Sequence, residues 1–409
     1  MKTRGFTTRI LHSDRQSHIE HGSLHKPVHT SIAFAHESAE SIAEVFQGKQ
    51  PGFTYGRQIN PTTNALEDKI TLMEDGLASV CFSTGMAAIA ACMLALLRKG
   101  DHLISSSFLF GNTNSFFTTL ENFGIEVSFV DATDAASVSA AVKANTRMVF
   151  TETIANPCTQ VSDLKEIGEL CAEKNLLYVV DNTMTSPCVF RPKSVKASLV
   201  INSLSKIICG HGNALGGSIT ETGLFDWRGY PNIAENYKSG KPEKWGLQQI
   251  RKKGLRDTGG TLAPQAAHII AVGAETLALR ASKAGENALK LARMFRDHPK
   301  IKKVFYPGLE QHPEHQRAQE LFNTFGALMS IELIDSMDCF DFLDRLQMVI
   351  ISSNLGDNRT LAIPVAHTIF HEMGAERRRT MGIGDNMIRL SIGIEDYGDL
   401  HDDFIQALQ

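Results

Sequence analysis

The chain has 409 residues, of which 43% are hydrophobic, and its formal net charge is −4 at pH 7. A chain of this length can bury a large core and normally forms more than one domain. Basic residues are not in excess, which argues against a nucleic-acid partner, and no stretch reaches the roughly 20 apolar residues that a membrane span requires.

The seven cysteines form no Cys-x-x-Cys pair, and several lie inside apolar runs. We therefore expect reduced, buried thiols, with no disulfides and no bound metal. The N-terminal segment lacks the apolar core of a secretory signal. These features predict a cytoplasmic protein without a membrane partner.

Residues 1–60 are rich in Ser, His and Gly and show no strong hydrophobic period, so they are predicted to form an arm that crosses a surface. Tyr55 and Arg57 stand two positions apart on an extended piece before Asn60-Pro61, and should project to the same side. A guanidinium and a hydroxyl can bind phosphate together. The alternative is that both residues only decorate the surface.

From Thr63 onward a helical pattern begins, and short apolar strands then alternate with helical segments as far as Thr220. This alternation predicts an α/β fold with a mostly parallel, doubly wound sheet. Neither a dinucleotide-binding glycine pattern nor a P-loop is present, which disfavours a nicotinamide oxidoreductase. The predicted strands are Ser79–Phe82, His102–Ser105, Glu126–Val130, Met148–Thr151, Leu176–Val180, Leu199–Ser203 and Gly216–Thr220.

Several of these strands end in residues suited to ligand binding, and open α/β sheets bind ligands at that edge. Gly85 and Met86 lie where a strand passes into a helix, so their N–H groups can hold an anion or simply begin a capped helix. Phe110 offers a ring for stacking or for the core. Asn156 can donate to a ring oxygen or carboxylate, or mark an Asn-Pro turn.

The strand over 176–180 delivers Asp181, and the next one delivers Ser203, Ser205 and Lys206. A buried carboxylate needs a cationic partner, whereas two hydroxyls beside a desolvated amine suit a phosphate and an aldehyde. These requirements together describe pyridoxal phosphate, with Asp181 keeping its ring nitrogen protonated. A helix N-cap at Asp181 and a solvated surface lysine are the alternatives.

Beyond residue 220 the sequence predicts a surface excursion or lid over 221–250, followed by a long helical stretch over 255–295. A smaller α+β unit comes last, with strands Ala327–Ile334 and Met387–Ile394. The expected division is thus an arm over 1–60, a cofactor-binding domain over 61–260 and a C-terminal domain over 261–409.

Arg389 stands inside the last apolar strand, and a buried arginine needs an anion. A substrate carboxylate would satisfy it. The alternative is a structural salt bridge, for instance to Glu395 or Asp396.

Three motifs follow one another along the chain: Arg57-x-x-Asn60-Pro61-Thr62, Ser203-x-Ser205-Lys206, and Arg389-Leu390-Ser391-x-Gly393-x-Glu395-Asp396. In this order, over nearly the whole chain, they resemble the Cys/Met-metabolism family of pyridoxal-phosphate enzymes. That family includes cystathionine γ-synthase, cystathionine γ- and β-lyases, methionine γ-lyase and the O-acyl-homoserine sulfhydrylases. The resemblance implies a fold-type I, aspartate-aminotransferase-like architecture and a homotetramer built from tight dimers.

The resemblance also implies a role for each candidate residue. Lys206 and Asp181 would be catalytic, the former holding the cofactor covalently and the latter pairing with its ring nitrogen. In such dimers Tyr55 and Arg57 would reach the phosphate in the neighbouring subunit's site. The remaining cofactor ligands would be Gly85, Met86, Phe110, Asn156, Ser203 and Ser205, and the substrate would contact Asn156, Ser353 and Arg389.

The chain also departs from the family pattern. Phe110 falls where most members carry a stacking tyrosine, and some O-succinylhomoserine sulfhydrylases are similar in this respect. Asn112 replaces a cysteine typical of methionine γ-lyases. The segment 353–357 resembles the sulfhydrylase version of a loop that reads Ser-Leu-Gly in lyases, and Ile363-Pro364 replaces a common His-Pro.

We therefore expect γ-replacement on an O-acyl-L-homoserine, of the sulfhydrylase or cystathionine γ-synthase type. The alternative is a methionine or cystathionine γ-lyase, which would release a 2-oxo acid and ammonia. A non-catalytic protein that keeps the fold for assembly or regulation is a third possibility.

Overall fold

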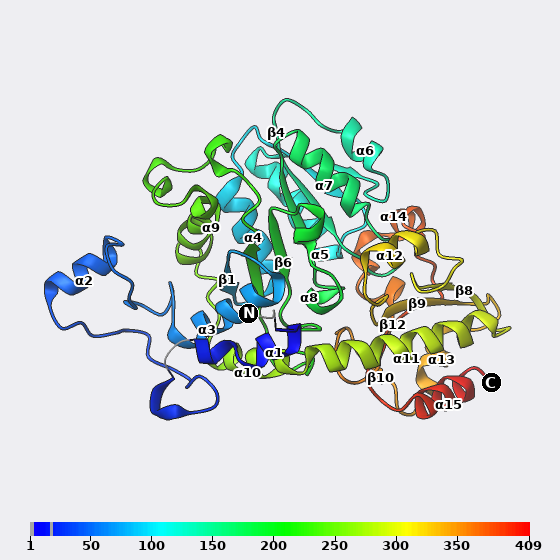
Figure 1. Ribbon diagram of the computed structural model, residues 1–409. Helices are drawn as coiled ribbons and strands as arrows, with labels where there is room; N and C mark the ends of the chain where they lie inside the picture. Colours follow the sequence, from blue (N-terminus) through cyan, green and yellow to red (C-terminus); the bar gives the residue numbers. More distant parts are fainter. Residues whose placement is uncertain (1–3, 17–18) are drawn as a thin grey trace.

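The computed structural model describes residues 4–16 and 19–409, and shows two bodies joined by the long helix α11 (Leu277–Asp297) (Figure 1). The larger body contains a seven-stranded sheet, and the smaller, C-terminal body contains a five-stranded one. The predicted α/β class with a smaller α+β unit is confirmed.

In the large sheet, six strands run in one direction and β7 runs against both of its neighbours. All seven predicted strands are present, and each begins and ends within two residues of the predicted position. In spatial order they are β1 (Ala78–Phe82), β7 (Gly217–Glu221), β6 (Leu199–Asn202), β5 (Leu177–Asp181), β4 (Thr146–Glu152), β2 (His102–Ser106) and β3 (Glu126–Val130).

Helices cover both faces of this sheet, because its strands are apolar on both sides. One face carries α4 (Gly85–Leu96), α5 (Gly111–Leu120) and α9 (Trp245–Gln249). The other face carries α3 (Pro61–Glu74), on which α10 (Pro264–Glu275) packs, and α7 (Leu164–Glu173) with α6 (Ala135–Ala140).

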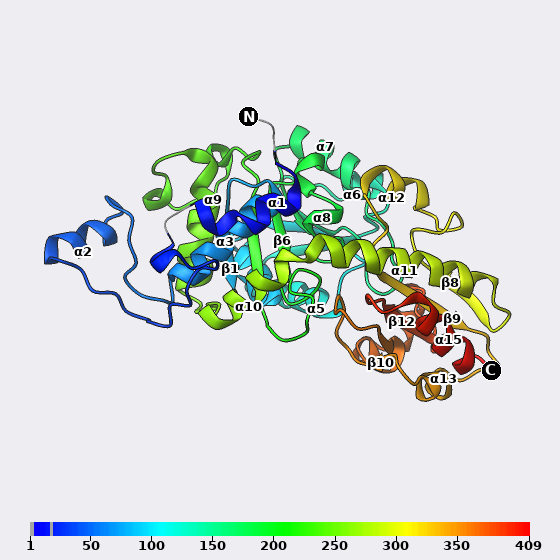
Figure 2. The ribbon, with the colours of Figure 1, turned by 60° about the horizontal axis from the view of Figure 1, so that its bottom comes forward.

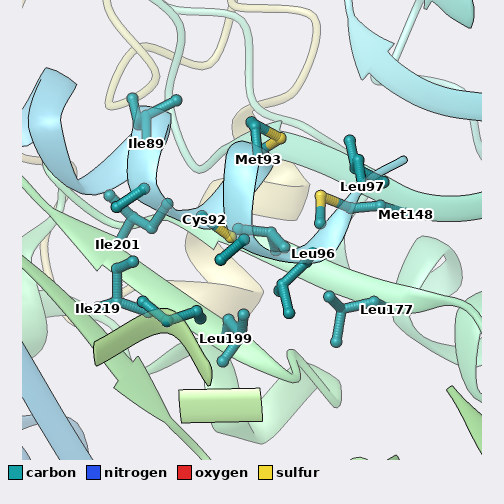
Figure 3. Close-up of a cluster of buried hydrophobic side chains, with 14 of the residues drawn as sticks. Ile89, Cys92, Met93, Leu96, Leu97, Met148, Leu177, Leu199, Ile201 and Ile219 are labelled. Atoms are coloured by element: carbon teal, nitrogen blue, oxygen red, sulfur yellow. The ribbon is translucent and has the colours of Figure 1, made fainter. Parts of the chain in front are cut away.

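Helix α4 is the central helix of the first face, and its sequence contains no charged residue. Figure 3 shows Ile89, Cys92 and Leu96 of this helix in the core over strands β6 and β7. Its outer side is covered by the π-helical turn Ile250–Arg256. A helix that is apolar all round must be buried on both sides, and these contacts bury it.

The segment over 221–250, predicted to be a surface excursion or lid, is a surface excursion with many exposed residues. This segment packs on the large body: Trp227 is fully buried, and forms an aromatic cluster with Phe225 and Tyr230. The Tyr230 hydroxyl donates to the carbonyl of Leu96, at the end of α4 away from Gly85. These three large rings bury apolar area, although the average composition of the segment is polar.

The N-terminal arm contains α1 (Phe6–Leu11) and α2 (Ala39–Phe46), and α2 stands clear of both bodies in two views (Figures 1 and 2). The first part of the arm differs from the predicted segment that only crosses a surface, because Ile10 is fully buried in the core that α3 and α10 share. An apolar side chain on a short helix is enough to anchor this part of the arm.

The sheet of the C-terminal body is antiparallel except for one short edge pair. Its strands are β10 (Ile350–Ile351), β11 (Leu361–Pro364), β12 (Met387–Ser391), β9 (Leu328–Leu333) and β8 (Ile301–Phe305). The remaining helices are α8 (Ser186–Val189), α12 (His315–Leu321), α13 (Cys339–Arg345), α14 (Ala375–Thr380) and α15 (Tyr397–Ala407). Within the described ranges, no helix is both long and apolar enough to cross a membrane.

Candidate active site

A cavity of about 270 Å³ lies at the carboxyl ends of β4, β5 and β6, and the C-terminal body closes its far side. Residues from segments as far apart as α4 and β12 meet there. Nine of the residues predicted from the sequence line it, namely Gly85, Met86, Phe110, Asn156, Asp181, Ser203, Lys206, Ser353 and Arg389. The structure therefore has a cavity at the edge of the sheet that was predicted to bind a ligand.

Lys206 follows β6 and is not a solvated surface lysine. Its Nζ donates to Asn354 Oδ1 at 2.8 Å, across the boundary between the two bodies. Burial and the positive charge of Arg389 lower the pKa of the Lys206 amine. A larger neutral fraction makes the amine a better nucleophile and base.

Asp181 ends β5 and faces the same cavity. The Thr183 N–H donates to Asp181 Oδ1 at 2.9 Å, while Thr183 Oγ1 accepts from the Ser203 N–H at 2.8 Å. Thr183 thus joins the ends of β5 and β6. Burial raises the pKa of the Asp181 carboxyl, as expected for a carboxylate that lacks a permanent cation.

Glu152 is a site residue that sequence reasoning missed. It ends β4 directly opposite Asp181 in the strand register, and is 6% exposed. Its Oε1 accepts from the Phe110 N–H at 2.8 Å. Burial and the charge of Asp181 raise the pKa of Glu152. Adjoining carboxyls, here the buried Glu152 and the half-buried Asp181, need a proton or a cationic ligand, so this pair suits a protonated ring nitrogen.

Arg389 lies on β12 and is 2% exposed. Its Nη2 donates to the carbonyls of Ser353 and Asn354, at 2.9 and 2.8 Å, and not to Glu395, which accepts from Thr360. Burial lowers the pKa of Arg389 to about 10. Among the described residues nothing accepts from its buried Nε, so the guanidinium retains capacity for an anion.

The start of α4 fits a phosphate. Thr84 caps the helix by accepting from the Ala87 N–H, and the earlier N–H groups of Gly85 and Met86 face the cavity end of the helix. A Cβ at Gly85 would come within 2.9 Å of Ser203 Cβ, so only glycine permits this approach.

Asn156 supplies a further unused group. It is 3% exposed, and its Oδ1 is buried without a partner in the part of the chain that the structure describes. Together with the free anion-binding groups and the carboxyl pair, this polar atom fits a ligand that carries a phosphate, a ring nitrogen and a ring hydroxyl.

Three predicted residues do not line this cavity. Ser205 Oγ bonds instead to the N–H and carbonyl of Gly216, at 2.9 and 3.2 Å. Tyr55 and Arg57 lie on the arm, where the guanidinium stacks over the tyrosine ring and donates to the Arg256 carbonyl. The lining residues absent from the sequence prediction are Ile89, Thr113, Glu152, Thr183, Met184, Leu355 and Ile369.

A mostly parallel sheet with a lysine, an aspartate and a helix N-terminus at one edge defines a pyridoxal-phosphate enzyme of fold type I. The chain belongs to the family described as "Cys/Met metabolism PLP-dependent enzyme", whose model matches residues 7–409. It is therefore a PLP-dependent enzyme of sulfur amino-acid metabolism, as predicted.

Relatives of known name span the whole chain. An L-methionine gamma-lyase of Fusobacterium nucleatum is 35% identical and covers 100% of this chain and 99% of its own. An O-acetyl-L-homoserine sulfhydrylase of Corynebacterium glutamicum is 33% identical, covering 97% and 95%. The crystal structure of a protein described as an O-acetylhomoserine (thiol)-lyase, from Campylobacter jejuni, matches with a TM-score of 0.93 at 29% identity, covering 99% and 100%, and contains N'-pyridoxyl-lysine-5'-monophosphate.

Proposed function

We propose that this enzyme catalyses γ-replacement on an O-acyl-L-homoserine, using a sulfur nucleophile to form homocysteine or cystathionine. The observation that carries the proposal is the contact between Lys206 and Asn354, because it sets the sulfhydrylase-like loop over 353–357 directly against the reactive amine. The 33% identity to an O-acetyl-L-homoserine sulfhydrylase over nearly the whole chain supports the same activity.

Within one chain, the cofactor would be held by residues of the large body. Lys206 would bind it covalently, Asp181 would face its ring nitrogen, and Phe110 would stack on the ring. The N–H groups of Gly85 and Met86, with the hydroxyl of Ser203, would bind the phosphate. Ser205, predicted as a further phosphate ligand, bonds to the Gly216 backbone instead. Asn156 would bind the ring hydroxyl or the substrate carboxylate.

Pyridoxal phosphate, when bound, supplies an electron sink for negative charge that develops on the substrate. Arg389, with the Ser353 segment beside it, would bind the α-carboxylate and fix the substrate's orientation. Lys206, freed as an amine, would remove the Cα proton and carry it along the substrate. Loss of a Cβ proton would then expel the γ-acyloxy group, after which the sulfur nucleophile would bond to Cγ.

We also propose a cytoplasmic homotetramer, a dimer of dimers in which each arm serves a neighbouring site. On the arm, Tyr55 is 41% exposed, and two apolar side chains, Ile32 and Phe46, are each 66% exposed. Apolar groups on a segment that stands clear of the chain's own core favour a partner surface. A second copy of the chain would bury them and receive Tyr55 and Arg57 at its phosphate site.

A second candidate activity is γ-elimination from methionine or cystathionine, which yields a 2-oxo acid and ammonia. The 35% identity to an L-methionine gamma-lyase over the full chain favours it. Both activities share the steps up to loss of the γ-substituent, and they differ in whether a sulfur nucleophile then adds to Cγ.

One assay separates the two. The holoenzyme is given O-acetyl- or O-succinyl-L-homoserine with sulfide or cysteine, and in parallel methionine or cystathionine alone. We expect homocysteine or cystathionine to form from an acyl-homoserine. Release of a 2-oxo acid and ammonia from methionine or cystathionine, with no replacement product, would establish the lyase instead.

A further inference from the structure

Glu74 is a fully buried carboxyl beneath the site that the mechanism does not use. It is the last residue of α3, and its Oε1 accepts from Asn182 Nδ2 at 3.1 Å and from Asn202 Nδ2 at 2.6 Å. Asn182 directly follows Asp181, and Asn202 directly precedes Ser203. One carboxyl oxygen therefore joins the ends of the two strands that deliver the cofactor-binding residues.

The hydrogen-bond partners around Glu74 favour a protonated carboxyl group. Glu74 Oε2 and Asn202 Oδ1 are both buried, and neither has a partner among the residues that the structure describes. Both oxygens are acceptors when the carboxyl is ionised. A proton on Glu74 Oε2 makes that oxygen a donor, and Asn202 Oδ1 is a nearby residue's acceptor that receives no other hydrogen bond from the described residues. Burial raises the pKa of Glu74 to about 7, although the two amides and Arg191 oppose the shift.

The ionisable groups that face Glu74 do not replace this proton. Arg191 follows α8, and its Nε donates to the Met73 carbonyl at 2.9 Å while its guanidinium lies over the Phe6 ring. Cys188 of α8 has a thiol whose pKa is raised by burial, so it stays neutral. Asp75, beside Glu74, is exposed and pairs with Lys193 at 3.7 Å.

We propose that Glu74 is a positioning residue for the cofactor and that it acts as a neutral carboxylic acid. In this form it clamps the ends of β5 and β6, so Asp181 and the Ser203–Lys206 segment keep their separation. Ionisation leaves a buried charge and two buried acceptor oxygens without a donor in the described part of the chain, which destabilises the arrangement at the two strand ends and weakens cofactor binding. Glu74 itself does not line the cavity.

The test is the pH dependence of pyridoxal-phosphate affinity in wild type and in Glu74→Gln, measured by titrating the apoenzyme and following absorbance. The amide of the variant can still accept with one atom and donate to Asn202 Oδ1 with the other, without ionising. We expect wild-type affinity to fall relative to the variant as pH rises through neutrality, by up to about tenfold per pH unit, the limit for one ionising group.

Glu221→Gln is the matched control. Glu221 is also fully buried with a raised pKa, but it ends β7 at the opposite edge of the sheet, where it accepts from Trp227 Nε1. The same chemical change there should leave the pH dependence of cofactor affinity as in wild type.

Superimposed profiles for wild type and Glu74→Gln would overturn the proposal, as would a variant that is folded by circular dichroism but binds the cofactor weakly at every pH. If Glu74→Gln does not fold, Glu74→Asp is the second test. This variant keeps a carboxyl group, but its shorter side chain places the carboxyl farther from the amides of Asn182 and Asn202. The pH midpoint of cofactor affinity in Glu74→Asp must then differ from the wild-type midpoint, and an identical midpoint refutes the role. Since the readout is cofactor binding, the outcome does not depend on which substrate the enzyme uses.

Discussion

Lys206 is the residue on which the proposed chemistry depends, and its surroundings act on it in two ways. Burial and the neighbouring Arg389 lower the pKa of its amine, while Asn354 accepts a hydrogen bond that directs the amine into the cavity. An oriented amine with a lowered pKa is better suited both to form the bond to the cofactor and to move protons on the substrate.

We predict that Lys206→Ala abolishes turnover, because no other group takes over both tasks. Borohydride reduction of the wild-type holoenzyme, followed by peptide mass spectrometry, should find the reduced cofactor on Lys206. Lys303→Ala, which changes an exposed lysine of β8, should keep full activity. Attachment of the cofactor to any other lysine would contradict the assignment.

We predict that Asp181→Asn has opposite effects on the apoenzyme and the holoenzyme. Burial raises the pKa of Asp181, so its contribution to stability is full below the unfolded pKa and is lost as pH rises through the folded value. The neutral amide escapes that loss, and the variant apoenzyme should have the larger free energy of unfolding at neutral pH. The holoenzyme should lose most of its turnover, since the buried ring nitrogen loses a charge partner worth about 3–5 kcal/mol.

Denaturant unfolding of both apoenzymes across the acidic and neutral range, together with turnover assays, checks this prediction. Near-normal turnover in Asp181→Asn would remove Asp181 from the proposed role. A variant apoenzyme less stable than wild type at neutral pH would show that the carboxylate is satisfied without the cofactor.

Among the secondary-structure elements, the meeting of α4 with the end of β6 determines whether a phosphate can be held. Gly85 lets the first turn of α4 approach Ser203 closely, since a Cβ there would lie 2.9 Å from Ser203 Cβ and 3.1 Å from its Oγ. At the other end of α4, Tyr230 and Asn232 bind the Leu96 carbonyl. The helix is thus held at its far end while its N-terminus stays open to the cavity.

We predict that Gly85→Ala folds but binds pyridoxal phosphate much more weakly, because the new methyl group must displace either the helix start or Ser203. Cofactor titration and circular dichroism measure the two effects. Gly398→Ala, in α15, is the control: a Cβ there meets nothing within 4 Å, so affinity should not change. Equal affinity in Gly85→Ala and wild type would show that the phosphate lies elsewhere.

In the whole molecule, the site is assembled from parts that are distant in sequence. The large body supplies Lys206 and Asp181, the C-terminal body supplies Arg389 and Ser353, and the arm with α2 projects away from both (Figure 2). If the arm completes a neighbour's site, activity and cofactor affinity belong to the assembly and fall on dilution by mass action.

We predict that Arg57→Ala weakens cofactor binding, and that mixing Arg57→Ala with Lys206→Ala chains restores activity. In a mixed dimer, one site combines the intact lysine of the first chain with the intact arginine of the second, whereas the other site carries both defects. Activity should approach half of the wild-type value per mixed dimer. Activity no greater than the sum of the two parents, with mixed dimers shown to be present, would refute the shared site.

Much of the fold and site could be predicted from the sequence because the signals are local. An apolar run followed by polar residues marks a buried strand and its end, so Lys206, Asp181 and the positions of the strands along the chain could be predicted. The polar average of the segment over 221–250 correctly predicted a surface excursion, but not the burial of Phe225, Trp227 and Tyr230, because those few aromatic residues differ from the average.

The side chains that arrive at the ligand-binding edge follow from the amino-acid sequence alone, because strand period and strand ends are properties of short segments. Their pairing follows from the packed chain: Glu152 with Asp181, Asn354 with Lys206, and Glu74 with both strand ends. Ser205 turned to the Gly216 backbone for the same reason. Hydrogen bonding and burial depend on groups from separate elements, and those partners exist only after the chain has packed.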